Sequence, residues 1–536
     1  MSTVIEHVEE PVQMQTQNII IIHPGSLYVK IGRASDLNPC TELHAVARKR
    51  LPGGLVHRDP ILPPLIPKLK DLEAERDACR LQVSHTLGSC LMSNNQRRYV
   101  TPPQQISAFN KRVIPEVVAE IGASWVKSEE NVVFGDSVLH LNPALDFNVH
   151  FPMKRGDLNR HSGVGGSLTG VLADLQAIWS WVISVRLGIP LQDLKNYRAV
   201  LVIPDIYNRQ YLKEYVTLLL DMGFSSCFLL QDHVAATFGC GVGTACVVDC
   251  GHSKTSVSCV EDGISHPATR VRLPYGGGDI TQCFYWLLKK CGFPYQADPD
   301  SFHDNMLLDK LKQDACHIEL DICGCKELTF TVNKPDSPVY KYTIQSGDEA
   351  IIAPLSLFYP ELLILTGPKQ ISTQGANTGD STDPHDADYL RETGRKKECE
   401  VEADEELAEV EASGSGEFCT NEGGLLPLDQ AILQSIQKCG SDDLKRKMYS
   451  SILLIGGGLK FKGIISWLEK RLSQQIPIPP KDDGERSVME GKDAAAVWKG
   501  AAILACLESA GELWISKDEW LRFGIKLIRE RGPFLW

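Results

Sequence analysis

Two segments of this chain, far apart in the sequence, share one pattern: a β-branched run, a short turn of small residues and a second apolar run. The first covers residues 18–33 and turns at Pro24-Gly25, and the second covers residues 244–260 and turns near Gly251. Runs of this kind joined by glycine, proline or serine predict strand–turn–strand units. Because the unit recurs roughly 226 residues further on, the pattern indicates an internal duplication with two related halves.

Amphipathic stretches follow each of these units. Apolar residues at helical spacing predict a helix over 168–182 that stops before Gly188. Asn208 is a predicted N-cap for a second helix. A third helix is expected to start at Asp279, where Gln282 completes a capping-box spacing. Strands alternating with helices predict an α/β fold.

Length and composition limit the classes of protein. At about 150 residues per domain, 536 residues suggest three domain-sized units or two larger ones with insertions. The net charge of −13 argues against a simple polycation for DNA. The chain has no run of 18 apolar residues and its first residues are polar and acidic, so we expect no membrane span, no signal peptide and an intracellular protein. The 17 cysteines are scattered, and many lie in apolar runs, so we expect reduced thiols.

Two segments lack the alternation of strand and helix patterns. Residues 46–112 hold 12 Lys and Arg against five Asp and Glu and are rich in proline, which predicts a basic insertion. Residues 366–424 are rich in Gly, Ser and Thr and then strongly acidic around 398–411. Like charges at this density repel, so this second insertion is predicted to be disordered.

The turns also carry the side chains that a phosphate site needs. Such a site combines converging backbone N–H groups, a cation and a carboxylate. The first turn offers Gly25, Ser26 and Lys30. The second offers the following polar and small residues: Asp249, Gly251, Ser253 and Thr255. Two further glycine clusters, at 276–278 and 456–458, come at strand or helix ends.

The order of these four glycine-rich turns resembles the actin fold, which sugar kinases and the nucleotide domain of 70-kilodalton heat-shock proteins share. Runs similar to those of actins and actin-related proteins extend the likeness from about residue 18 to the end: 134–136, 178–179, 202–205, 451–458, 497–500 and 513–520. The resemblance implies two duplicated ribonuclease-H-like halves around a nucleotide cleft. It places an N-terminal tail at 1–17, the halves at 18–242 and 243–495, and at 496–536 a segment that returns to the first half.

By the same resemblance the cleft binds ATP, with or without Mg²⁺. The residues implied around the phosphates are Gly25, Ser26, Leu27, Lys30, Asp249, Gly251, His252, Ser253, Lys254 and Thr255. Those implied around the base are Gly277, Lys312, Gln313, Gly457 and Phe461.

Several positions depart from the actin pattern. His23 stands where actin has an aspartate, and His252 stands where actin has a second one. Lys254 adds a large cation beside the phosphates, and the lysine that flanks adenine in actin falls on Ala494. The water-positioning glutamine falls on Gln231 or Asp232. Losing positioned carboxylates costs orders of magnitude in rate, so we expect no catalytic residues and at most very slow hydrolysis.

Four further runs (23–26, 203–208, 283–287 and 447–453) resemble one nuclear branch of the actin-related proteins. That branch implies a non-polymerising structural subunit of an ATP-dependent chromatin-remodelling complex in the nucleus, acting in transcription and DNA repair. The implied partners are a long helical segment of the remodeller ATPase, nuclear actin, other actin-related proteins, histones and linker DNA, with no membrane. The alternative is an active ATPase or sugar-kinase-like enzyme, which predicts a full set of carboxylates. A heat-shock-type chaperone would need a further domain.

The sequence allows two interpretations for several of these residues. Lys30 and Lys254 either contact phosphate or are solvated strand lysines. His23 and His252 are either metal ligands or hydrogen-bonded turn residues. Because no third ligand is visible and the Cys323–Cys325 pair has no matching pair, we predict no metal site. The basic groups at 48–50, 97–98 and 111–112 either contact DNA or form a solvated face.

Overall fold

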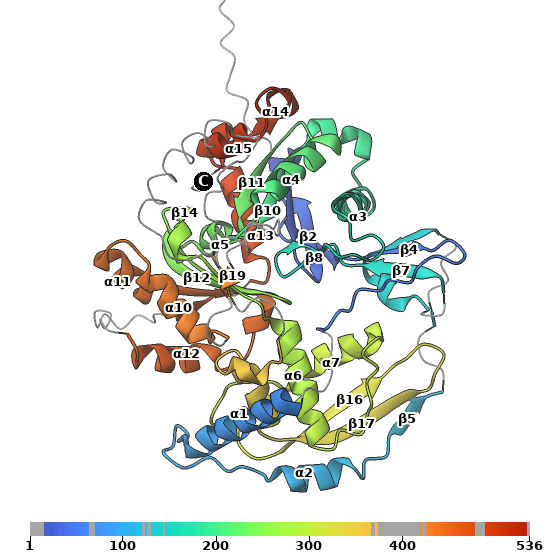
Figure 1. Ribbon diagram of the computed structural model, residues 1–536, viewed down its shortest axis with the longest axis vertical. Helices are drawn as coiled ribbons and strands as arrows, with labels where there is room; N and C mark the ends of the chain where they lie inside the picture. Colours follow the sequence, from blue (N-terminus) through green and yellow to red (C-terminus); the bar gives the residue numbers. More distant parts are fainter. Residues whose placement is uncertain are drawn as a thin grey trace, which may run out of the picture.

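A computed structural model describes residues 16–63, 70–120, 124–125, 130–142, 145–365, 370–372, 419–420, 425–476, 488–491 and 493–532. In it the chain forms two α/β halves side by side, each built on its own large sheet (Figure 1).

The sheet of the first half has six strands in the order β22-β11-β10-β1-β2-β3. These strands are β1 (Ile19–Pro24), β2 (Tyr28–Arg33), β3 (Cys40–Leu43), β10 (Arg198–Ile203), β11 (Ser226–Gln231) and β22 (Ile515–Ser516). β1 runs antiparallel to β2 and parallel to β10, which is parallel to β11. The strand–turn–strand prediction for 18–33 is therefore confirmed.

The sheet of the second half repeats this order around its own hairpin. β12 (Thr244–Cys250) runs antiparallel to β13 (Thr255–Glu261) and parallel to β20 (Ile452–Ile455), which is parallel to β21 (Val488–Glu490). β15 (Val271–Leu273) pairs with β13 as β3 pairs with β2. This repeated order confirms the duplicated α/β fold. β14 (Ile264–Ser265), β18 (Gln370–Ser372) and β19 (Cys419–Thr420) extend this sheet.

Helices cover both sheets, and two of the three predicted ones begin as expected. α3 (Leu168–Trp181) is capped by Ser167 and continues as a π-turn over Val182–Arg186, and α4 (Arg209–Asp221) is capped by Asn208. The third prediction is wrong at its start. α6 (Gly277–Lys290) begins two residues earlier, and Asp279 is its third residue, whose carboxylate accepts the N–H of Gly276 at 2.9 Å. The helix starts with glycines because the backbone lies very close to the β12–β13 turn: a Cβ on Gly276 would lie 2.7 Å from the Gly251 carbonyl oxygen.

One described helix, Leu168–Arg186, is long and apolar enough to cross a membrane, with a mean hydropathy of 1.4 over its most apolar window. Its residues Val171, Leu175, Ile178 and Trp179 are buried in the core of the first half. Its Asp174 is also buried and pairs with Arg48 at 2.7 Å. Packing against the sheet therefore accounts for its apolar composition.

The two halves meet where α5 (Asp232–Cys240) crosses α13 (Ala496–Ala505). The crossing is very close at two glycines: a Cβ on Gly239 would lie 1.9 Å from the Ala496 carbonyl oxygen, and one on Gly500 would lie 1.7 Å from that of Ala235. A hydrophobic core shared by β1, β10, β12 and β20 surrounds this contact. The helix crossing thus forms the base of the cleft between the halves.

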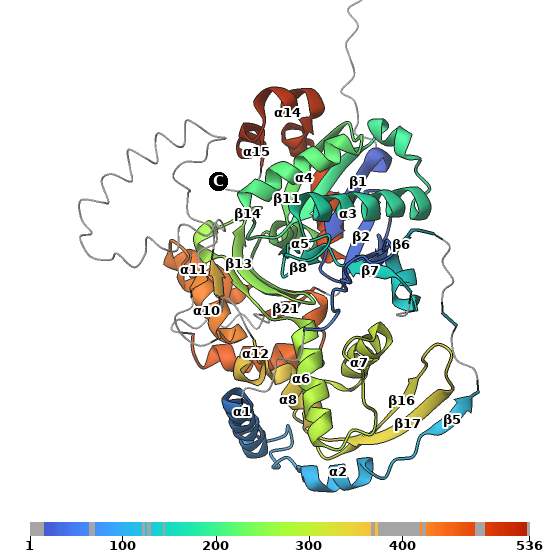
Figure 2. The same ribbon diagram turned by 45° about the vertical axis from the view of Figure 1, so that its right-hand side comes forward.

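The described residues of the basic segment 46–112 form strands and helices. The segment starts with β4 (Val46–Lys49), which lies between β6 (Val132–Phe134) and β7 (Phe147–His150), and then forms α1 (Lys70–Ser89) and α2 (Pro103–Asn110). Both helices, and β5 (Glu116–Ala119) after them, pack on the second half (Figure 2). The segment therefore joins the halves on the side opposite the C-terminal helices.

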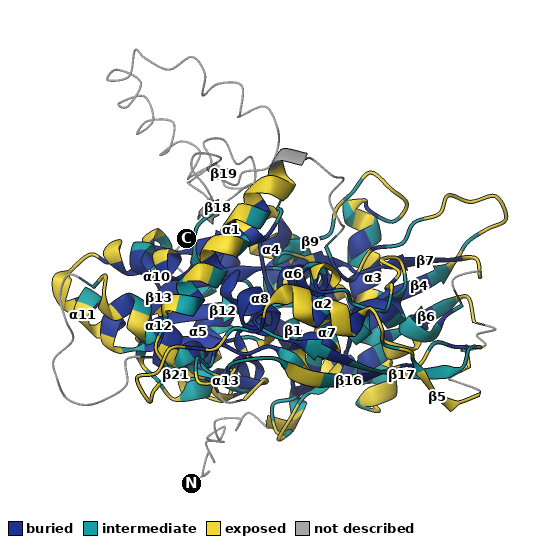
Figure 3. Cartoon of the chain, turned by 90° about the horizontal axis from the view of Figure 1, so that it is seen from below, coloured by how far each residue is buried: buried dark blue, intermediate teal, exposed yellow. Residues whose placement is uncertain are grey.

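In the second half, α1 and α2 pack on a group of elements that lies apart from the large sheet. This group consists of α6, α7 (Phe302–Ala315), α8 (Glu349–Leu355), β16 (Lys326–Val332) and β17 (Val339–Ser346). The large sheet of the second half is covered by α10 (Leu428–Gln437), α11 (Asp442–Ser450) and α12 (Ile464–Ser473). A short hairpin of β8 (Met153–Lys154) and β9 (Asp157–Leu158) belongs to the first half. The strands of both sheets are largely buried at the centre, whereas α1 and α2 expose one face (Figure 3).

The C-terminal segment lies on the first half. β22 pairs with β11, and α14 (Lys517–Phe523) and α15 (Lys526–Arg531) follow it. The predicted disordered acidic stretch at 398–411 lies outside the described residues. None of the cysteines in the described part of the chain forms a disulfide.

Candidate functional site

A cavity of about 660 Å³ lies between the halves, at the ends of both hairpins. The structure brings most of the predicted site residues to its wall. Those that line it are Gly25, Ser26, Leu27, Lys30, Asp249, Gly251, His252, Lys254, Gly277, Lys312, Gln313, Gly457 and Phe461. Ser253 and Thr255 do not line it, so their direct role in the predicted site is not supported by the geometry.

The first loop is a tight turn between β1 and β2. The Gly25 N–H donates to the Tyr28 carbonyl at 2.9 Å, and a Cβ on Gly25 would lie 2.6 Å from that oxygen, so only glycine fits. Lys30, on β2, donates to the Ala494 carbonyl at 2.8 Å and so reaches the opposite side of the cleft. Burial lowers the pKa of Lys30, while Asp249 acts in the opposite direction.

The second loop carries a buried cation, Lys254. Its Nζ lies 2.9 Å from Asp232 Oδ2 and 3.5 Å from Asp249 Oδ2. Burial by itself would lower the pKa of Lys254, but the two carboxylates outweigh it and raise the pKa, so the ammonium stays charged. The turn of the β8–β9 hairpin closes over it: a Cβ on Gly156 would lie 2.8 Å from the Lys254 side chain. Lys254 is therefore an ion-paired cleft residue, and the solvated-lysine interpretation is wrong.

Ser253 and Thr255 support the loop from behind. The Ser253 hydroxyl donates to Ser26 Oγ at 2.7 Å and accepts the Arg155 N–H at 2.9 Å, which ties the two loops together. Thr255 is fully buried and donates to the Tyr275 carbonyl at 2.8 Å. The alternation of a strand explains this placement, because Lys254 and Thr255 must face opposite sides.

The two histidines that stand at the aspartate positions differ in their surroundings: His23 is on β1, and its buried Nδ1 has no hydrogen-bond partner among the described residues, whereas His252 is in the second turn. Burial, followed by repulsion from Lys30 and Lys254, holds the pKa of His23 well below its usual value. The His252 Nε2 donates to the Ile61 carbonyl at 2.7 Å, and burial lowers the pKa of its ring. A donated N–H leaves His252 Nε2 without a lone pair, which supports the hydrogen-bonded turn over the metal ligand.

The base end of the cavity is built by α6, α7 and the glycines after β20. Lys312 donates to the Gly277 carbonyl at 2.9 Å and to Asp309 Oδ1 at 2.6 Å. Gln313 donates to the other oxygen of Asp309 at 2.7 Å. A Cβ on Gly457 would meet nothing within 4 Å, so the wall is open there.

Sequence reasoning missed several residues of the wall, among them Tyr28, Asp309, Lys460 and Asp493. Asp309 is detectable in principle, since it precedes Lys312 by three positions and shares its helix face. Of the two candidates for the glutamine position, Asp232 lines the cavity, whereas Gln231 is buried and donates to Asp205 Oδ1 at 3.0 Å.

These residues fit a nucleotide and do not fit a resident Mg²⁺. The cavity offers room, glycine turns and the cations Lys30 and Lys460 for a polyphosphate. Mg²⁺ in nucleotide sites is usually held through carboxylates and phosphate oxygens. Here Asp232 and Asp249 both face the ammonium of Lys254, which supplies the positive charge from the chain itself.

A duplicated α/β fold with a cleft closed below by two crossing helices is the architecture of the actin class, and the Actin family profile matches residues 107–533. The chain therefore belongs to the actin family.

Within that family the chain is similar to proteins called actin-related protein 8. It is 51% identical to the protein of Aedes aegypti, with 98% of this chain and 99% of that protein covered, and 39% identical to the human protein, with 98% and 93% covered. A solved structure of human actin-related protein Arp8 in its ATP-bound state superposes with a TM-score of 0.85 and 38% identity, covering all of both chains.

Proposed function

We propose that this protein is a non-polymerising nuclear subunit of an Ino-eighty type chromatin-remodelling complex, which binds ATP as a structural ligand and does not turn it over. The ATP part is supported by the cleft and by the ATP-bound state of the human relative. The proposed absence of turnover is supported by Lys254, because its ammonium is paired with the carboxylates of Asp232 and Asp249.

The proposed role of the cleft is to bind and hold. Lys30 and Lys460 would neutralise the phosphates, Lys254 would offset the charge of Asp232 and Asp249 beside them, and the glycine turns would let the backbone approach. Asp232 and Asp249 are both held by the Lys254 ammonium, and burial keeps the pKa of His23 well below its usual value, so each of these three groups is a weak general base for water. A bound nucleotide would then stabilise the closed arrangement of the two halves.

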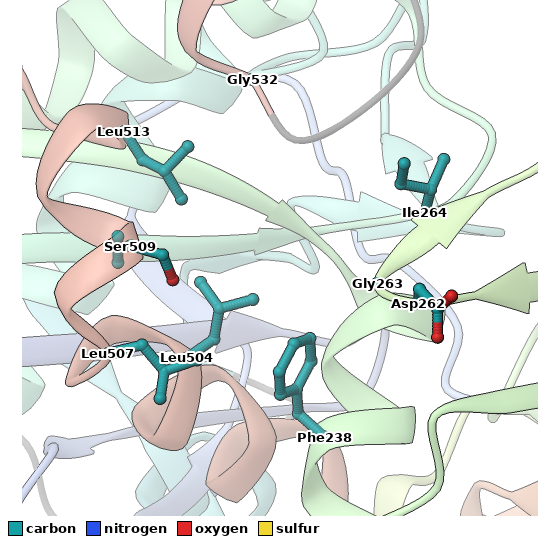
Figure 4. Close-up of a pocket in the computed structure, with 10 residues that line it drawn as sticks. Phe238, Asp262, Gly263, Ile264, Leu504, Leu507, Ser509, Leu513 and Gly532 are labelled. Atoms are coloured by element: carbon teal, nitrogen blue, oxygen red, sulfur yellow. The ribbon is translucent and has the colours of Figure 1, made fainter.

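A second hollow, of about 400 Å³, suits the proposed helical segment of the remodeller ATPase. Figure 4 shows it between Phe238 of α5, the Gly263–Ile264 turn and the leucines of α13 and the segment after it. Leu507 is 40% exposed and Ile264 is 43% exposed, so apolar surface is available for a helix face.

Contact with DNA and histones is proposed from the exposed basic side chains of the segment 46–112. Lys49, Arg97, Lys111 and Arg112 are exposed and available for phosphates, whereas Arg98 is buried in an ion pair with Asp348. The proposed absence of polymerisation comes from the added bulk of α1 and α2 on the second half.

The test is equilibrium binding of labelled ATP to the purified full chain, with Mg²⁺ and with EDTA, beside a phosphate-release assay. Wild type should bind with less than about a threefold difference between the two conditions, because the counter-ion is built in. Lys254→Ala should bind about tenfold or more weakly in EDTA and recover with Mg²⁺, because two carboxylates then face the phosphates. Lys213→Ala, at an exposed position of α4, is the control.

The results separate the alternatives. Turnover on the order of seconds or faster would establish the ATPase and overturn the structural role. Failure of the wild-type chain to bind ATP at all would remove the nucleotide from the proposal and leave only partner surfaces.

A further inference from the structure

Three histidines and one aspartate from distant parts of the sequence meet beside β7 and α3, away from the cleft. They are His57, Asp59, His150 and His161, and one ligand atom from each lies within 4.8 Å of those of the others. None of them lines the nucleotide cavity.

The backbone determines this meeting. Residues 57–59 run alongside β7: the Val149 N–H donates to the His57 carbonyl, and the Asp59 N–H donates to the Val149 carbonyl at 3.0 Å. Because residues two apart in an extended chain face the same side, His57 and Asp59 both turn toward His150. The loop between β9 and α3 then brings His161 onto them.

The loop is shaped to lie against the imidazole rings. A Cβ on Gly163 would lie 2.9 Å from His57 Nδ1, one on Gly165 would lie 2.5 Å from His150 Cε1, and one on Gly166 would lie 2.5 Å from His161 Nδ1. Only glycine allows the backbone to come this close. The ring centroids are 5.0 Å apart for His57 and His150 and 4.1 Å apart for His57 and His161.

The aspartate is oriented as metal-binding carboxylates commonly are. Asp59 Oδ1 lies 3.0 Å from His57 Nε2, while Asp59 Oδ2 accepts the Phe151 N–H at 2.9 Å and the Asn159 amide at 3.1 Å. Hydrogen bonds of this kind from outside the ligand shell orient the ligand and strengthen binding.

The central histidine is buried. His150 is only 5% exposed, and its ring packs against the ring of His57 and the backbone of Gly165. A buried polar ring is costly unless its nitrogens have partners, and a bound ion would be such a partner.

We propose that these four side chains form a binding site for a divalent zinc-type ion. Three imidazoles and a carboxylate make a tetrahedral donor set that zinc accepts. The rings now stack within 13° of parallel, so coordination requires them to turn about their Cβ–Cγ bonds until the ligand atoms are about 3.3 Å apart around the ion. The bound ion would fasten the start of the basic segment and the loop before α3 to β7.

The experiment uses the full chain, stripped of metal, titrated with Co²⁺ and then Zn²⁺. We expect one Co²⁺ per chain, the visible absorption of a tetrahedral ion without the intense thiolate charge-transfer band, and displacement by Zn²⁺. Zn²⁺ should also raise the melting temperature, because it binds the folded chain in preference.

Variants assign the ligands. His57→Ala and His161→Ala, both at partly exposed positions, should each weaken Zn²⁺ binding by about tenfold or more, and Asn159→Ala by about tenfold through the orientation of Asp59. His85→Ala, at an exposed position of α1, should change nothing. Circular dichroism checks that each variant is folded. Absence of the cobalt band from wild type, its persistence at unchanged affinity in both histidine variants, or a thiolate spectrum would each overturn the proposal.

Discussion

At the scale of single residues, His44 shows how a buried side chain holds the first loop. It is fully buried, and its ring donates Nδ1–H to the Gly25 carbonyl at 2.7 Å. Burial, which outweighs that hydrogen bond, lowers the pKa of His44 to about 4. The unfolded chain takes up this proton near pH 6.5 and the folded chain only near 4, so stability falls as pH decreases through that window.

The corresponding prediction concerns His44→Asn, which can still donate to Gly25 but has no titrating group. Between about pH 7.5 and 5 the wild type should lose about 2 kcal/mol more unfolding free energy than the variant. Urea unfolding of both proteins at the two pH values measures this difference, and the other histidines cancel in the comparison. An equal loss in both proteins would show that His44 is protonated in the same range folded and unfolded.

At the scale of elements, the crossing of α5 and α13 depends on two missing side chains. Gly239→Ala or Gly500→Ala would place a methyl group within 2 Å of a backbone oxygen. Each should lower the free energy of unfolding by about 3 kcal/mol, the upper end for overpacking, because backbone cannot move aside as a side chain can. Thermal and urea unfolding measure the loss.

The matched control is Gly88→Ala in α1, where a Cβ would meet nothing within 4 Å. That variant should be unchanged or more stable by about 0.5 kcal/mol, because alanine is the better helix residue. Stabilities for the two crossing variants equal to that of wild type would mean that the helices can separate without cost.

At the scale of the whole molecule, the basic segment joins the halves through buried charge. Arg98 pairs with Asp348 at 3.0 Å and also donates to the carbonyls of Leu320 and Ile322. Arg98→Ala leaves the carboxylate without its partner and should cost about 3 kcal/mol. Hydrogen exchange should speed up in α2 and β5, which this contact holds on the second half.

Arg97→Ala, at the neighbouring position, is the control for Arg98→Ala. Arg97 is exposed, so its removal should leave stability and exchange unchanged. Similar effects from both variants would mean that general positive charge, and not the buried pair, attaches the segment.

Local patterns in the sequence determined the elements of this fold. β-branched runs, the Ser167 and Asn208 caps and the glycine turns specify strands, helices and hairpins through contacts between near neighbours, so the duplication and the α/β class could be predicted. Local sterics predicted the glycine turns, and the resemblance to the actin fold that these turns and other sequence runs carry placed Gly25, Lys30 and Gly457 at the nucleotide site, where they line the cavity.

Only the tertiary structure decided which distant residues meet. That Lys254 lies between Asp232 and Asp249, that Arg98 is buried against Asp348, and that His161 reaches His57 all depend on loop geometry and the approach of whole elements. Ion pairing, desolvation and ligand geometry act through space, and residues separated by tens to hundreds of positions carry no local pattern that records the contact. For this reason the proposed zinc-type site could not be predicted from the sequence.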